Sequence, residues 1–126
     1  MPHVVIEGPL DLSQAGREFR PIVQRDGNDI LKVERLYLST DGEEGLLDTL
    51  VVEAGHRQRF FIQVRLREGG GATVRLLPLT DPEKTDGVRR ALARVAAWLR
   101  GLRPDRLVFG ATNIGAFLEP PADGGS

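Results

Sequence analysis

The clearest alternation of hydrophobic and polar residues lies between Arg59 and Arg67. A period of two is typical of a β-strand that buries one of its faces. The residues of the predicted buried face are Phe60, Ile62, Val64 and Leu66. Successive glycines at 69–71 can turn the chain, and residues 72–79 are again largely hydrophobic. We therefore predict a β-hairpin from these two segments.

The other strand-like segments are shorter or less regular. The predicted strands are residues 3–8, 31–39, 59–67, 72–78 and 106–109. Within 31–39 the alternation changes phase, and a β-bulge near Glu34 and Arg35 would return the hydrophobic residues to one face. Residues 46–53 fit either a helix or a strand, and we favour a short strand after a helical turn. Residues 111–118 are expected to form an extended arm.

Two segments have the hydrophobic spacing of a helix. The first covers residues 11–20 and is interrupted by Pro21, because a proline ring clashes with the preceding helical turn. The second covers residues 82–101 and has a continuous hydrophobic stripe. Its candidate caps are Thr80, with Glu83 as its partner, and Asp81, with Pro82 at the first helical position.

This order of elements predicts an α+β fold. We expect two β-α-β units in tandem, forming a two-layer sandwich with two main helices on one face of a mixed β-sheet and an extra hairpin strand. Residues 1–119 would form a single domain, and residues 120–126 a disordered tail.

The composition narrows the function classes. The chain has 126 residues, of which 40% are hydrophobic and 28% charged, as in ordinary globular domains. A formal net charge of −1 gives no reason to expect nucleic acid or a membrane as partner. Without cysteine, and with two histidines that lack carboxylates at ligand spacing, we expect no metal site. We see no signal-peptide pattern and therefore expect a cytoplasmic protein.

Basic residues share the polar face of the strand at 59–67. Arg59, Arg65 and Arg67 lie there together with Phe61, its one aromatic residue. This face could be a solvated edge, a subunit interface or a clamp for a carboxylate.

Pro2 stands directly before the first hydrophobic strand. If Met1 is removed, Pro2 becomes a secondary amine at the tip of that strand. An α-amino group has a pKa of ~7.7–8.0, and an apolar pocket lowers it by disfavouring the charged form. Such a group could accept and donate protons near neutral pH. The same two residues are also a permissible start for any protein.

Residues 1–7 resemble the start of the tautomerase superfamily, in particular the 5-carboxymethyl-2-hydroxymuconate isomerases. The resemblance implies a tandem β-α-β fold, a trimer, arginines that hold substrate carboxylates, and an N-terminal proline that moves a proton between carbon atoms. It implies Pro2 as the catalytic residue, with Arg35 and Arg75 as candidate substrate ligands. Phe61 completes the predicted substrate site.

Two function hypotheses follow. The first is an isomerase that moves a proton in an unsaturated oxo or enol carboxylic acid, needs no cofactor, and forms a homo-oligomer, expected to be a trimer. The alternative is a non-catalytic oligomeric module of the same fold with a structural or small-molecule-binding role. The chain departs from the family in the extra strand at 72–79 and in Pro21 within the first helix.

Overall fold

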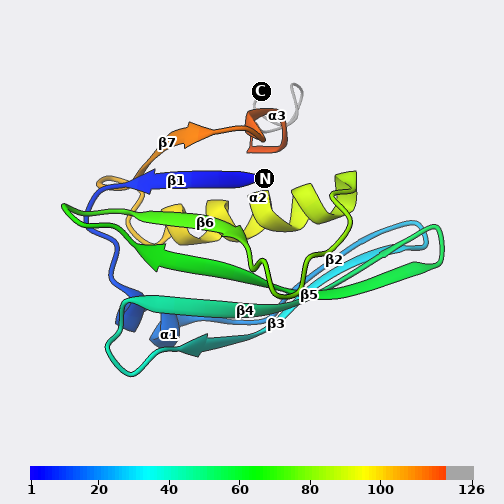
Figure 1. Ribbon diagram of the computed structural model, residues 1–126, viewed down its shortest axis with the longest axis horizontal. Helices are drawn as coiled ribbons and strands as arrows, with labels where there is room; N and C mark the ends of the chain where they lie inside the picture. Colours follow the sequence, from blue (N-terminus) through cyan, green and yellow to red (C-terminus); the bar gives the residue numbers. More distant parts are fainter. Residues whose placement is uncertain (119–126) are drawn as a thin grey trace.

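A computed structural model describes residues 1–118, and these form a seven-stranded β-sheet with three helices (Figure 1). The elements in chain order are β1 (His3–Glu7), α1 (Leu12–Glu18), β2 (Ile22–Asp26), β3 (Asp29–Leu38), β4 (Glu44–Glu53), β5 (His56–Leu66), β6 (Ala72–Leu76), α2 (Asp86–Gly101), β7 (Val108–Thr112) and α3 (Gly115–Leu118). The strand order is β2-β3-β4-β5-β6-β1-β7, and every neighbouring pair is antiparallel. The predicted tail at 120–126 lies outside the described residues.

Helix α2 packs against one face of the sheet. It contacts β1, β3, β4 and β6, which span most of the sheet, because the sheet curves around the helix (Figure 1). The buried hydrophobic side chains of α2 are Val88, Ala91, Leu92, Ala93, Val95, Ala96 and Leu99. The strand residues that join them in the core include Val4, Ile6, Leu31, Val33, Leu47, Phe60, Ile62, Val64, Val74 and Leu76. The hydrophobic core therefore lies between α2 and the concave face of the sheet.

Four of the predicted strands are confirmed. Segments 3–8, 59–67 and 72–78 correspond to β1, β5 and β6, and segment 31–39 corresponds to β3. The predicted β-bulge is also confirmed, because the register of β3 against β4 shifts between Val33 and Arg35. The shift places the hydrophobic residues on both sides of the bulge on the concave face.

The predicted tandem β-α-β sandwich with a mixed sheet is wrong. Parallel strands need a crossover between them, whereas here the strands from β2 to β6 follow one another as antiparallel hairpins. Residues 46–53 belong entirely to β4, without a preceding helical turn. The predicted extended arm at 111–118 is instead the end of β7 followed by α3.

Strand β2 was not predicted from the sequence. Phe19, Ile22 and Val23 continue the helical spacing of α1, but α1 ends at Glu18 and Phe19 already has an extended backbone. Pro21 then disfavours a helix at the residue before it, and the chain enters β2 at Ile22. The Phe19 ring packs edge-on against Trp98 of α2, with the ring centroids 5.5 Å apart.

Helix α2 begins later than predicted. Its N-cap is Thr85, whose side chain accepts a hydrogen bond from the Val88 amide, and neither candidate cap at 80–81 is used. Thr80 instead accepts a hydrogen bond from the Phe61 amide at 3.2 Å. The segment before α2 thus runs along the part of β5 that β6 does not cover, and protects an otherwise free strand edge.

Glu53, at the end of β4, holds the first turn of α2. Its carboxylate accepts hydrogen bonds from the Gly87 amide, at 2.8 Å, and from the Thr85 hydroxyl. A negative charge at this position also interacts favourably with the positive end of the helix dipole. Residue 87 has to be glycine for this contact, because a Cβ atom there would overlap the Glu53 carboxylate.

We expect Gly87→Ala to destabilise the protein. Alanine within a helix is normally favoured over glycine by about 0.5–1 kcal/mol, but here it would displace Glu53 and break hydrogen bonds to a charged group, each worth about 1.5–3 kcal/mol. Urea denaturation should therefore show a net loss for Gly87→Ala. Gly101→Ala is the matched control, because a Cβ there meets no atom within 4 Å.

The double variant Glu53→Ala/Gly87→Ala separates this contact from other effects. It should be no less stable than Glu53→Ala alone, since the overlapping carboxylate is absent. A Gly87→Ala variant as stable as the wild type would contradict the assignment.

Candidate functional site

Three of the four predicted site residues lie on one face of the sheet. This is the convex face, which points away from α2 and is called the open face below. Its central row crosses five strands and consists of His3, Arg75, Gln63, Leu46 and Tyr37. Phe61 and Arg35 lie in the neighbouring row, where each is paired with Asp48. The fold therefore brings Arg35, Phe61 and Arg75 to the same face.

The side chain of Arg75 is held in place by its neighbour in the central row. The Nε of Arg75 donates a hydrogen bond to the Gln63 Oε1 at 2.7 Å. The amide nitrogen of Gln63 in turn donates to the Glu44 carboxylate. Gln63 is only 4% exposed, so its two hydrogen bonds are shielded from water. This chain of contacts fixes the guanidinium of Arg75 and uses only its Nε.

A hollow of about 240 Å³ lies beside Arg75 on the open face. Its lining side chains come from β5, β6 and the turn between them, and they are Arg65, Leu66, Arg67, Thr73 and Arg75. Neither Arg65 nor Arg67 forms an ion pair or side-chain hydrogen bond with another residue of the described chain. Cationic side chains and a hydroxyl group thus converge on this hollow, which favours an anion.

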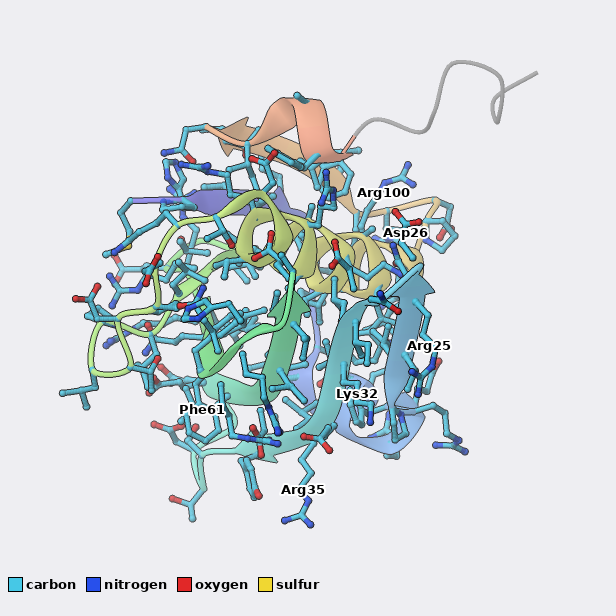
Figure 2. The ribbon with its side chains drawn as sticks, turned by 90° about the vertical axis from the view of Figure 1, so that its right-hand side faces the viewer. Arg25, Asp26, Lys32, Arg35, Phe61 and Arg100 are labelled. Carbon is cyan, nitrogen blue, oxygen red and sulfur yellow. The ribbon has the colours of Figure 1, made fainter. Side chains whose placement is uncertain are left out.

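Arg35 and Phe61 form a separate cluster further along the open face. The Tyr37 and Phe61 rings meet edge to face, with centroids 6.3 Å apart. Arg35 donates a hydrogen bond to the Tyr37 hydroxyl at 3.3 Å. Figure 2 shows the Arg35 side chain directed away from the ribbon. Arg35 belongs to β3 and Arg75 to β6, with two strands between them, so the structure does not join them in one pocket.

Pro2 lies apart from these residues. It is buried, and its position in the alternation of β1 places it with Val4, on the side of α2. A hollow of about 340 Å³ beside it is lined by Met1, Lys84, Arg89, Asn113 and Ile114. The Met1 carbonyl accepts a hydrogen bond from the Asn113 side chain at 2.8 Å. The expected combination of Pro2 with Arg35, Arg75 and Phe61 is therefore not present.

Comparison with known proteins gives no further assignment: no family model, curated protein or solved structure matches the chain significantly. None of the helices among residues 1–118 is long and apolar enough to cross a membrane. Within the same residues, no group of three or more histidine, cysteine, aspartate or glutamate side chains is placed to hold a metal ion.

Sequence reasoning missed Gln63 and Glu44. Gln63 was assigned to the polar face of a strand, where an amide is unremarkable. The available signal was the register, because a hairpin from 59–67 and 72–78 places residue 63 opposite residue 75. The pairing of β5 with β4, which brings Glu44 alongside, could not be predicted while 46–53 remained ambiguous.

Arg59, one of the cationic residues considered for a clamp, is already paired. Its guanidinium lies 2.6 Å from the Glu34 carboxylate and 3.1 Å from that of Asp48. The hydrogen bond from Arg59 lowers the pKa of Glu34 below its ordinary value. Arg59 therefore stabilises the bulged part of β3 and is not free to bind a ligand.

We expect this ion pair to make stability depend on pH. The pKa of Glu34 is lower in the folded than in the unfolded protein, where it is about 4.3. The ion pair therefore stabilises the folded state fully above the unfolded pKa. This stabilisation is lost as the pH falls through the folded pKa and Glu34 becomes protonated. Urea midpoints of wild type and Arg59→Gln should therefore differ most near neutral pH and converge in acid. Arg57→Gln, on the same strand, should show no such convergence; equal behaviour of the two variants would contradict the pairing.

Proposed function

We propose that the protein is a binding module for a small anion and that Arg75 is its main recognition residue. The observation that carries the proposal is the contact between Arg75 and the buried Gln63, which orients the guanidinium before any ligand arrives. Preorganisation of this kind lowers the entropic cost of binding. An arginine that only interacts with solvent does not need such an orienting contact, whereas Arg75 is held by the side-chain amide of the buried Gln63.

The shape of the site indicates the class of ligand. With its Nε engaged by Gln63, Arg75 presents its two terminal nitrogens, which match two oxygens of one carboxylate or phosphate group. Arg65 and Arg67 line the same hollow and add positive charge, and Thr73 adds a hydroxyl donor. These groups favour a dianion such as a phosphate or a short dicarboxylate over a neutral molecule.

Isothermal titration calorimetry with inorganic phosphate and with succinate tests the proposal. Arg75→Gln should weaken binding by about tenfold or more, the value of one or two hydrogen bonds between charged groups. Gln63→Met should weaken binding less, because the arginine remains but is no longer oriented. The charge-matched control is Arg35→Gln, which should bind like the wild type since Arg35 lies outside the hollow.

The two probes also distinguish the ligand classes. Tighter binding of phosphate would favour phosphorylated ligands, and tighter binding of succinate would favour dicarboxylates. Wild-type protein that binds neither anion, or Arg75→Gln that binds as tightly as the wild type, would refute the proposal.

A second candidate function rests on the hollow beside Pro2. In a chain without Met1, the Pro2 amine would lie beside this hollow, which Lys84 and Arg89 also line. Both cations have carboxylate partners, since Lys84 lies 2.8 Å from Asp81 and Arg89 lies 3.8 Å from Asp86. Nearby positive charge disfavours the ammonium form of an amine. The chemistry that such a site supports is proton transfer on an enol or oxo acid, whose carboxylate would have to replace Asp81 and Asp86 as the partner of Lys84 and Arg89.

Intact mass of the purified protein decides whether this chemistry is possible, because a retained Met1 converts the Pro2 nitrogen into an amide. If Met1 is absent, we expect enol–keto conversion of a phenylenolpyruvate-like acid to fall by ~10²–10⁴ in Pro2→Ala. Arg89→Gln should weaken substrate binding, and Arg75→Gln, on the opposite face, should change neither rate nor binding. No rate above buffer in protein lacking Met1 would remove this candidate.

A further inference from the structure

A groove follows the exposed side of α2. It consists of two hollows, of about 170 and about 480 Å³, which share Gln24 and Arg90 as lining residues. Gln24 belongs to β2, one end of the sheet, while the far wall is formed by α3, which follows β7 at the other end. The groove thus lies where the curved sheet does not close around the helix.

The two parts of the groove differ in chemistry. The smaller hollow is bordered by the carboxylates of Asp26, Asp29 and Glu53, at the tips of the hairpins near the start of α2 (Figure 2 labels Asp26 on β2). Two of these carboxylates are already used, since Asp29 accepts a hydrogen bond from the Ala54 amide and Glu53 holds the start of α2. Apolar residues of β3 and β4 also line the smaller hollow, and Arg90 is the one cationic side chain among its described lining residues.

The larger hollow combines an apolar wall with positive charge. Its apolar lining side chains are Ala93, Ala97, Ala116, Phe117 and Leu118. The small alanines of α2 leave the space that longer side chains would fill, and Phe117 and Leu118 of α3 close it on the far side. Arg90 and Arg94 lie one helical turn apart, so they line the same side of α2.

The two arginines are not equivalent. The guanidinium carbon of Arg90 lies 6.0 Å from the centre of the Phe117 ring, a cation–π distance that holds Arg90 against the α3 wall. Within the described chain, Arg94 forms neither an ion pair nor a hydrogen bond. A positive charge without a partner among residues 1–118, next to an apolar wall, is complementary to an anionic group that carries an apolar body.

We propose that the larger hollow binds a small amphiphilic carboxylate, distinct from the anion held on the open face. The apolar chain or ring of this ligand lies against Ala93, Ala97 and Phe117. Its carboxylate is bound by Arg94, with Arg90 beside it. No carboxylate of the described part of the chain lines the larger hollow, and its charged lining side chains are Arg90 and Arg94, which favour a negative charge on the ligand.

Octanoate is the probe, and octylamine and acetate are its matched controls. Calorimetric titration should show binding of octanoate and binding of both controls at least about tenfold weaker. Octylamine lacks the negative charge that Arg94 needs, and acetate lacks the apolar body. Equal binding of octylamine or of acetate, or no binding of octanoate, would overturn the proposal.

Substitutions in α2 test whether octanoate binds in the larger hollow. Arg94→Gln should weaken octanoate binding by about tenfold, and Ala97→Leu should abolish it by filling the hollow, while leucine at this exposed helical position keeps the helix. The charge control Arg103→Gln and the open-face variant Arg75→Gln should both bind octanoate normally. Loss of octanoate binding in Arg75→Gln, or normal binding in Arg94→Gln, would show that octanoate binds elsewhere. Either result would refute the proposed site in the larger hollow.

Discussion

The packing of α2 against the concave face is the interaction on which the rest of the structure depends. The curved sheet has one hydrophobic face and, among residues 1–118, no second sheet covers it, so the helix supplies the other half of the core. Leu92, Val95 and Leu99 are essentially inaccessible to solvent in this arrangement. Fixing one end of the helix through Glu53 and Gly87 sets where that apolar stripe meets the strands. The remaining side of α2 is left uncovered, and this is the origin of the groove.

The dependence on α2 has a consequence for the order of folding. Strands β2 to β6 follow each other in the chain and pair through short turns, so they can form locally. Strand β1, in contrast, pairs with β6 and β7, which are both distant from it in the sequence. In the sequence, α2 lies between β6 and β7. Without α2, the hairpins from β2 to β6 would leave much of their hydrophobic face uncovered.

The same features explain how much of the fold was predictable. Strict alternation identifies strands such as β5, and a change of phase identified the bulge near Glu34, because both depend only on which residues are buried. The pairing of strands depends on contacts between segments distant in the sequence. A helix between two strands was taken as a crossover to a hydrogen-bonded parallel neighbour. Instead, α1 joins β1 to β2, which lie far apart in the sheet, and α2 joins β6 to β7, which run in the same direction but on either side of the antiparallel β1. Hydrophobic spacing alone does not distinguish these cases.

The two faces of β1 limit what the N-terminus can do. Successive residues of a strand point to opposite faces, so His3 joins Arg75 on the open face while Val4 joins the core. Pro2 is one residue before His3 and therefore lies on the side of α2, away from both arginines that the family resemblance suggested. A proline amine and an arginine on opposite faces of one sheet cannot hold the same small molecule. Proton transfer by Pro2 would have to rely on Lys84 and Arg89, and any ligand of the oriented Arg75 would occupy a separate site.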